Sequence, residues 1–260
     1  MNSRASCAKS SAPQSSPRSS RRPVIPSSSK DSHNLSNRPR VLRSVNLADT
    51  PPTLEEAIAL KQGRAIDERA LRSLFDEART ANGFLDAPVS RDLIERAIDL
   101  AELGPTSANT LPVRYVVVQS PEAKEKLKPG VGPTNQEKTM KAPATVIVAA
   151  DLKFYENIKR TFPTRPEMAD RFSSPDVAEM AKGFARDNAL LQMGYFILAL
   201  RSLGLDAGPM GGFDRAVVDA AFFPDGRLIS LYLINVGYGD DSKSFPRLPR
   251  LPATEIASFV

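Results

Sequence analysis

Residues 173–214 read SSPDVAEMAKGFARDNALLQMGYFILALRSLGLDAGPMGGFD, and the chain is organised around this stretch. Ser174 followed by Pro175 combines a preferred N-cap with proline at the first helical position. Between Ala189 and Leu200 almost every residue is apolar, and a helix that is apolar all round lies in a core or a subunit interface. The sequence therefore predicts a long central helix over 175–203, about 43 Å in length, ended by Gly204.

Three glycines and one proline follow this helix, in residues 208–214. Because glycine and proline interrupt regular structure, neither helix nor strand is predicted here. Taken alone, such a segment is a tight loop between two helices. The alternative is a backbone platform for a planar cofactor, since glycine lets a flat ligand approach the main chain closely.

The first 50 residues differ in kind from the rest. They hold nine Lys and Arg, two acids and many Ser and Pro, and no aromatic residue occurs before Phe75. Such a segment buries too little apolar surface to offset the entropy of ordering it. We expect a disordered tail over 1–50, a linker or short helix over 51–66 and one folded domain over 67–260.

The tail also carries the positive charge. The chain has a net charge of +5, the tail contributes +7, and the remaining −2 does not indicate a nucleic-acid surface on the folded part. The tail is suited to binding an acidic surface. It also resembles a transit peptide in lacking early acids, or is an extension from an upstream start codon. It has no apolar segment typical of secretory signals, and no membrane span is predicted, so the expected location is cytoplasmic.

The only cysteine, Cys7, and the only histidine, His33, both lie in the tail. The folded part therefore has no Ser-His-Asp or Cys-His mechanism available to it. It also has no Cys/His zinc site and no disulfide, and we expect no metal. Its chemistry has to come from carboxylates, Lys, Tyr, hydroxyl groups or a bound cofactor.

Helical and β-branched segments alternate along the folded part, which indicates an α/β or α+β sandwich. Asp67 and Ser90 are placed as N-caps of two helices. Neither a dinucleotide-binding glycine fingerprint nor a P-loop is present. The expected helices cover 68–80, 91–104, 121–128, 175–203 and 214–223, and the expected strands cover 114–119, 144–150 and 227–236.

Several polar segments are candidates for binding anions or heterocycles. They are Arg79-Thr80-Ala81-Asn82, the loop 104–109, the segment 135–138, and the pair Arg247 and Arg250, which is spaced to clamp a phosphate. Each has an ordinary structural explanation when taken singly. An Arg at a helix C-terminus, for example, usually compensates the helix dipole.

Taken in order, these segments resemble the flavin-dependent nitroreductase superfamily, and most closely its malonic semialdehyde reductase (3-hydroxypropanoate dehydrogenase) branch of pyrimidine degradation. The resemblance covers roughly residues 70–260. The matching motifs are ART-x-NG (78–83), GPTSAN (104–109), N-x-x-K-T (135–139), LGLDAGPM-x-GFD (203–214), INVGYGD (234–240) and RLPRL (247–251).

The resemblance implies an α+β three-layer sandwich: a mainly antiparallel sheet flanked by helices, one long central helix, and an entwined homodimer with FMN in a cleft between subunits. Arg79, Arg250 and Arg247 would hold the FMN phosphate, assisted by Thr80 and Asn82. Lys138 would stabilise negative charge on the reduced flavin. The remaining contacts that it implies are made by Thr106, Ser107, Asn109 and Asn135, by Pro209 and Met210, and by the backbone N–H of Gly211 or Gly212, which would face flavin N5 in place of a catalytic side chain.

Two departures from the family pattern affect the expected substrate. Gly211 stands where the family commonly has an acidic residue, and Leu111-Pro112-Val113 stands where it commonly has Gln-Pro-Trp. Both changes alter the wall near the cofactor. They argue against general nitroaromatic reduction and favour the semialdehyde branch.

The implied reaction is hydride transfer from NADH or NADPH through FMN to malonic semialdehyde, giving 3-hydroxypropanoate. Candidates for the cation that binds the substrate carboxylate are Arg114, Arg165 and Arg171. One alternative is a broad nitro-compound or quinone reductase on the same fold. The alternative of a different class is a non-catalytic dimeric binding protein, which would contain no flavin.

Overall fold

The computed structural model describes residues 53–260, so the expected tail over 1–50 lies outside the described residues. The chain divides into two units between Ala57 and Ile58, a boundary that falls within the first helix, and the sheet and the other helices belong to the second unit. The helices are α1 (Leu54–Gln62), α2 (Glu68–Leu71), α3 (Arg91–Ala101), α4 (Pro121–Leu127), α5 (Pro133–Lys141), α6 (Ile158–Thr161), α7 (Met168–Ser173), α8 (Ala178–Ser202), α9 (Arg215–Phe222) and α10 (Ala253–Ile256). The strands are β1 (Val113–Val118), β2 (Ala144–Asp151), β3 (Asp206–Met210) and β4 (Leu228–Gly237).

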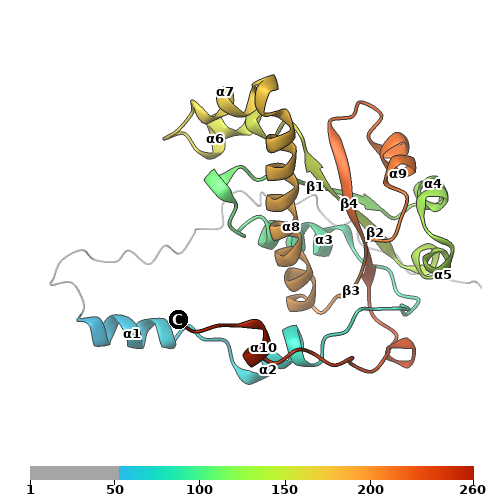
Figure 1. Ribbon diagram of the computed structural model, residues 1–260. Coiled ribbons are helices and arrows are strands. Elements are labelled where there is room, and N and C mark those ends of the chain that lie inside the picture. The colour runs from blue at the N-terminus through green and yellow to red at the C-terminus, as the bar shows by residue number, and fades with distance from the viewer. Residues whose placement is uncertain (1–52) are drawn as a thin grey trace, which may run out of the picture. The chain divides into compact units, whose positions relative to one another are not determined.

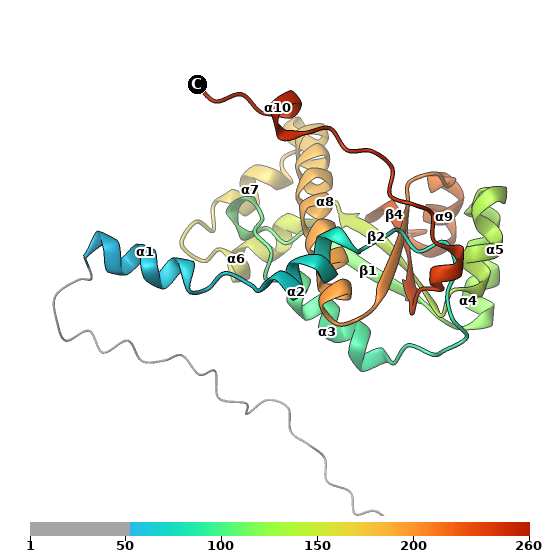
Figure 2. The same ribbon diagram turned by 90° about the horizontal axis from the view of Figure 1, so that it is seen from below.

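The four strands form one sheet in the order β1-β2-β4-β3, and every neighbouring pair is antiparallel. Helices α3 and α8 cover one face of the sheet, and α4 and α9 cover the other (Figures 1 and 2). The predicted α+β sandwich with a central antiparallel sheet and one long helix is therefore confirmed. No helix within residues 53–260 is both long and apolar enough to cross a membrane.

The sequence prediction of irregular structure over 208–214 was wrong for its first three residues, which belong to β3. Pro209 is tolerated because β3 is an edge strand, in which a residue without an N–H group need not break a hydrogen bond to a neighbouring strand. Gly208 is required because a Cβ there would lie 2.6 Å from the main-chain oxygen of Ala81. Glycine and proline thus permit a strand here, and the chain leaves the sheet only after Met210.

The central helix α8 is shorter than predicted. Residues 175–177 form a 3₁₀ turn, and the Ser174 side chain makes no cap hydrogen bond. Val177, with φ −113° and ψ 11°, interrupts helical geometry just before α8 begins. At the other end, Gly204 adopts φ +75°, which is the left-handed conformation of a C-terminal glycine.

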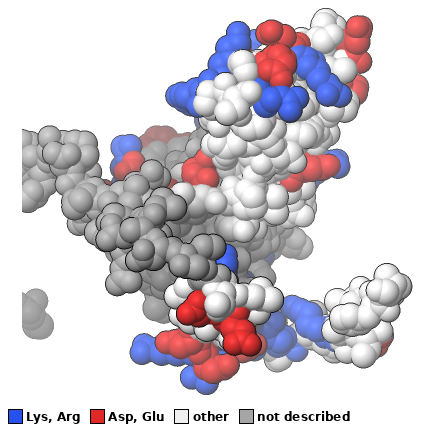
Figure 3. All heavy atoms as spheres, turned by 90° about the vertical axis from the view of Figure 1, so that its left-hand side faces the viewer, with Lys and Arg blue, Asp and Glu red and all other residues white. Residues whose placement is uncertain are grey.

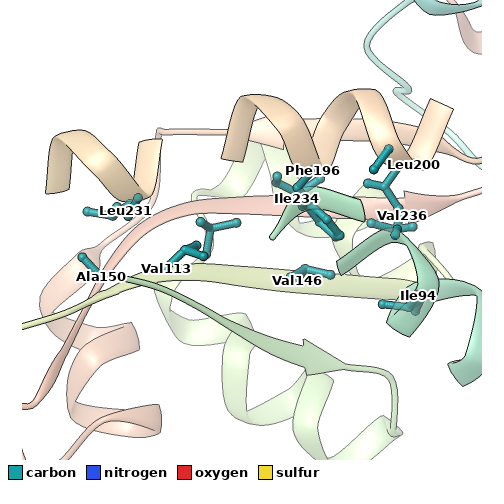
Figure 4. Packing of buried hydrophobic residues seen from close by; sticks show 14 of the residues in the cluster. Ile94, Val113, Val146, Ala150, Phe196, Leu200, Leu231, Ile234 and Val236 are labelled. Atoms are coloured by element: carbon teal, nitrogen blue, oxygen red, sulfur yellow. The ribbon is translucent and has the colours of Figure 1, made fainter. Parts of the chain in front are cut away.

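The core lies between α8, α3 and the sheet. Phe196 and Leu200 of α8 are fully buried and pack against Ile234 and Val236 of β4 (Figure 4). Within this single chain α8 is only partly buried, because Tyr195 is 41% exposed and Leu191, another α8 residue, is 46% exposed. One side of the helix therefore presents apolar surface to solvent.

Of the three predicted N-caps, Asp67 and Ser90 are confirmed, whereas Ser174 is not. The Asp67 carboxylate accepts a hydrogen bond from the N–H of Ala70, and the Ser90 hydroxyl accepts one from Leu93. The helix that Asp67 begins does not continue to residue 80. After Leu71 it widens into a π-helical turn over Arg72–Asp76 and ends there.

A lysine lies under the second face of the sheet. Lys124 of α4 is only 4% exposed, and its ammonium donates to the Thr139 main-chain oxygen (2.7 Å) and to Thr145 Oγ1 (2.6 Å). No carboxylate forms an ion pair with it among the described residues. Burial lowers the pKa of Lys124 from 10.5 to about 8.

The free energy of unfolding should depend on pH through the titration of Lys124. A lysine whose pKa is lower in the folded state destabilises the fold while it is protonated, and the penalty is relieved as pH rises through about 8 toward 10.5. Relative to Lys124→Met, the wild type should gain at most about 3 kcal/mol of unfolding free energy between pH 7 and pH 10. Urea unfolding at pH 7, 8.5 and 10 measures this difference, and parallel pH curves for the two proteins would contradict it.

Candidate active site

Three arginines converge on the end of the π-helical turn. Arg247 Nη2 donates to the main-chain oxygens of Phe75 (2.7 Å), Asp76 (2.7 Å) and Ala78 (2.9 Å). Arg79 donates to the last two of these, at 2.9 and 3.0 Å, and Arg201 donates to the oxygen of Leu74, at 3.0 Å. Carbonyl groups at a helix C-terminus attract cations, so this turn gathers positive charge at one place.

The guanidinium groups line a cavity of about 550 Å³, which we call the arginine pocket. Its lining residues are Phe75, Asp76, Ala78, Arg79, Thr80, Asn82, Arg201, Phe245, Pro246, Arg247, Leu248 and Arg250. Arg79, Thr80, Asn82, Arg247 and Arg250, which the sequence analysis assigned to the FMN phosphate, therefore come together.

The lining of the arginine pocket includes one acidic residue, Asp76. None of the four arginines takes part in an ion pair within the described part of the chain. Burial, together with repulsion from Arg247, lowers the pKa of Arg201, although the charge of Asp206 opposes the shift. Clustered guanidinium groups without acidic partners form a site for a dianion such as a phosphate monoester.

A second cavity, of about 420 Å³, adjoins the first and shares Asn82 and Phe245 with it. We call it the lysine pocket; it is also lined by Gly83, Phe84, Thr134, Glu137, Lys138, Lys141 and Lys243. Lys138 Nζ donates to Asn82 Oδ1 at 3.4 Å. Asn135 lies one turn before Lys138 on α5, so the segment 135–138 borders the segment 79–82.

The glycine segment after β3 reaches the same neighbourhood. Val131, just before α5, forms an isolated β-bridge with Phe213, and Asp214 donates its N–H to the oxygen of Gly130. Main-chain N–H of Ala81 donates to the oxygen of Ala207 at 3.0 Å. The structure thus places Pro209, Met210, Gly211 and Gly212 next to both segments that hold the predicted cofactor residues.

Tyr232 of β4 explains the glycine at position 211. A Cβ on Gly211 would lie 3.3 Å from Cε1 of the Tyr232 ring. That separation is tighter than ordinary van der Waals contact, so a side chain at 211 would have to displace the ring. The ring therefore fills space beside Gly211 that a side chain would otherwise use.

The loop 104–109 lies outside both pockets of its own chain. Ser107 N–H donates to Asn188 Oδ1 of α8 (2.7 Å), Thr106 Oγ1 accepts from Leu111 N–H, and Asn109 Nδ2 donates to the oxygen of Thr161. Ala108, Asn109 and Leu111 all have positive φ, between 45° and 51°. Such strain in non-glycine residues persists only where the surroundings impose it, and it often marks functional loops. Thr106, Ser107 and Asn109 line neither the arginine pocket nor the lysine pocket.

The three candidates for binding the substrate carboxylate differ in their surroundings. Arg114 binds Asp151, which is 1% exposed, at 2.8 Å, and donates to two main-chain oxygens of its own strand and loop. Arg227 binds the same carboxylate from the other side. Arg165 is exposed and pairs with Glu167 at 2.6 Å, and Arg171 is exposed on α7. Arg114 is therefore committed to holding β1 and β2, whereas Arg165 and Arg171 face solvent.

Sequence reasoning missed Arg201, Lys243 and Tyr232. Arg201 stands in the last turn of α8, two residues before the LGLDAGPM motif, so its position beside that motif was the available signal. Lys243 follows INVGYGD in the same way. Tyr232 is separated from Gly211 by a helix, and only the sheet brings them together.

Known proteins of one family match most of this chain. The model of the Nitroreductase family matches residues 76–238. A protein of Stenotrophomonas maltophilia named "Putative NADH dehydrogenase/NAD(P)H nitroreductase" is 50% identical over 193 residues, which cover 74% of this chain and 97% of that protein. A protein of Caulobacter sp. with the same name is 45% identical over 195 residues, covering 75% and 98%.

Solved structures share the fold at low sequence identity. A nitroreductase family protein from Streptococcus pneumoniae has a TM-score of 0.62 at 24% identity, covering 73% of this chain and all of that one. A structure from Exiguobacterium sibiricum, described as a "putative nitroreductase in complex with FMN", has a TM-score of 0.63 at 22% identity and covers 75% and 98%. From the extent and identity of these matches, this chain belongs to the nitroreductase family.

Proposed function

We propose that this chain is an NAD(P)H-dependent FMN oxidoreductase that reduces malonic semialdehyde to 3-hydroxypropanoate, as a homodimer in the cytoplasm. The observation that carries the cofactor assignment is the arginine pocket, which gathers four guanidinium groups with no ion-pair partner among residues 53–260. FMN ends in a phosphate monoester, the group for which such a pocket is suited. When bound, FMN supplies the hydride chemistry that accepts reducing equivalents from NAD(P)H and delivers them to the substrate.

Each segment of the site has one role in this proposal. Arg79, Arg247 and Arg250 bind the phosphate, while Thr80 and Asn82 extend that contact. Lys138 and Asn135 of α5 lie along the pyrimidine end, where the ammonium stabilises negative charge. The backbone N–H of Gly211 or Gly212 orients the reacting edge, backed by Met210 and Pro209.

A second copy of the chain completes the site in this proposal. Thr106, Ser107 and Asn109 line neither pocket of their own chain, so we assign them to the cofactor cleft of the partner. The exposed apolar residues of α8, such as Leu191 and Tyr195, suit a subunit interface. Figure 3 shows an area of uncharged side chains on the face that it draws, below a group of charged ones.

One feature of the structure supports a small aldehyde rather than a bulky nitroaromatic substrate. No side chain stands at position 211, and Tyr232 fills the space beside it. The semialdehyde also carries a carboxylate that needs a cation. Because Arg114 is committed to Asp151, we assign this role to Arg165 or Arg171, whose guanidinium groups are exposed.

The function is tested in two steps with the purified protein. We expect a yellow protein that releases FMN on denaturation and bleaches on anaerobic addition of NADH or NADPH. The holoenzyme should then turn over malonic semialdehyde with a kcat/KM at least about tenfold above that for a nitroaromatic, a difference of roughly 1.4 kcal/mol in transition-state binding. A colourless protein that FMN cannot reconstitute would overturn the cofactor assignment.

A broad nitro-compound or quinone reductase is the second candidate, and the names of the curated relatives favour it. The same turnover comparison separates the two. Faster reduction of the nitroaromatic would support the second candidate and leave the FMN assignment in place.

A further inference from the structure

A chain of buried hydrogen bonds starts from the ammonium of Lys124. Thr145 Oγ1, which accepts from Lys124, donates to Asn235 Oδ1 at 2.7 Å. Asn235 Nδ2 donates to Thr139 Oγ1 at 3.2 Å, and this hydroxyl donates to the sulfur of Met210 at 3.8 Å. Thr139, Thr145 and Asn235 are all 0% exposed. Because an ammonium group can only donate, Thr145 Oγ1 has to accept from it, and each later group in this series donates to the next.

These residues support the three segments assigned to the cofactor. Thr139 follows Lys138 directly on α5, and Met210 precedes Gly211. Asn235 pairs with Thr145 on one side and with Gly208 on the other in the sheet register, and a Cβ on Gly208 would meet the oxygen of Ala81. The segments 79–82, 135–138 and 209–212 therefore share one buried polar support.

The charge on Lys124 is isolated. The charged side chains on the elements packed around it are Glu122, Glu125 and Lys126 of α4, Lys128 directly after α4, Glu137, Lys138 and Lys141 of α5, Asp151 of β2, and Arg215 and Asp219 of α9. Glu125 pairs with Lys128, Glu137 with Lys141, and Asp151 with Arg114 and Arg227. Burial alone accounts for the lowered pKa of Lys124.

We infer that Lys124 is a positioning residue of the cofactor site. Its protonated amine binds the end of α5 to the sheet, and this contact keeps Lys138, Asn82 and the Met210–Gly211 segment in position. This inference rests on the proposed FMN site. A buried cation without a carboxylate is costly to a fold. The ammonium makes one short hydrogen bond to α5 and one to β2, so the charge connects this helix to the sheet.

The test is the dissociation constant of FMN, measured by flavin fluorescence from pH 6.5 to 9 on wild type, Lys124→Met and Lys126→Met. Lys126 lies on the same helix and is exposed, and its ammonium lies 4.7 Å from the centroid of the Phe222 ring. Its variant therefore removes the same charge from α4. In wild type the constant should rise about threefold to tenfold as pH passes about 8, because a neutral amine makes weaker hydrogen bonds. Lys124→Met should bind about tenfold more weakly at pH 7 and vary less than about twofold over the range, whereas Lys126→Met should follow wild type.

The outcomes are distinguishable. A wild type that binds FMN with no change across pH 8, or a folded Lys124→Met variant with wild-type affinity and pH profile, overturns the role of Lys124 and leaves the FMN site standing. A wild type that binds no FMN at any pH overturns the proposed function and this inference together. If Lys124→Met does not fold, Thr145→Val replaces it. This variant keeps the ammonium but removes its link to Asn235, and wild-type affinity in it overturns the inference.

Discussion

Replacing Arg250 with glutamine should weaken FMN binding by about tenfold to 100-fold while leaving riboflavin binding unchanged. A charge-assisted hydrogen bond to phosphate is worth about 1.5–3 kcal/mol, which corresponds to this range. Riboflavin lacks the phosphate, so it reports every other contact of the flavin. Titration of the apoprotein with both compounds, followed by flavin fluorescence, measures the two affinities.

Arg250 is the most informative of the four arginines because it contributes least to the fold. Among residues 53–260 its guanidinium donates only to the main-chain oxygens of Leu248 and Pro249 in its own arm. Arg247, by contrast, holds three carbonyl groups at the end of the π-helical turn, and its removal would disturb the pocket itself. The unfolding free energy of Arg250→Gln should therefore stay within about 0.5 kcal/mol of wild type.

The matched control is Arg91→Gln, which removes one exposed guanidinium that pairs with Glu95 on α3. It should bind FMN and riboflavin as wild type does. Equal losses of FMN and riboflavin affinity in Arg250→Gln would contradict a phosphate contact. Unchanged FMN affinity would contradict it as well.

The elements of this fold were predictable where a local rule governs them. Asp67 and Ser90 cap helices because the cap depends on residues three positions apart. The strands β1, β2 and β4 follow from β-branched runs. Strand β3 was not predictable, because Gly208 is required there by the close approach of Ala81, which lies more than 100 residues away in the sequence.

The site shows the same division. The motif segments 78–83, 135–139 and 247–251 contribute residues to the two adjoining pockets, whereas the loop 104–109 lines neither of them. The commitment of Arg114 to Asp151 depends on the pairing of β1 with β2, which brings together residues 37 positions apart. The role of Lys124 was equally hidden, because its spacing on α4 is that of an ordinary surface lysine among Glu122, Glu125 and Lys126.

The largest loss of stability should follow Gly208→Ala. The added Cβ would lie 2.6 Å from the oxygen of Ala81, which is main chain and cannot rotate away. Overpacking of this kind costs about 1–3 kcal/mol, and strain on the hydrogen bond from Ala81 N–H to the oxygen of Ala207 adds to it. We expect a loss of about 3 kcal/mol and a fall in Tm of roughly 6–12 °C, on the scale usual for a domain of about 200 residues.

The same substitution should also weaken FMN binding, since Ala81 lies between Thr80 and Asn82 of the arginine pocket. Gly183→Ala is the control. Gly183 lies in α8, and a Cβ added there would have no neighbouring atom within 4 Å, so alanine should stabilise the helix by about 0.5–1 kcal/mol. Thermal unfolding and flavin titration of the two variants separate a general effect of alanine from the clash. An unchanged Tm in Gly208→Ala would mean that the segment 79–82 moves away from the new Cβ at no energetic cost. In that case the close packing of β3 against this segment does not position the arginine pocket.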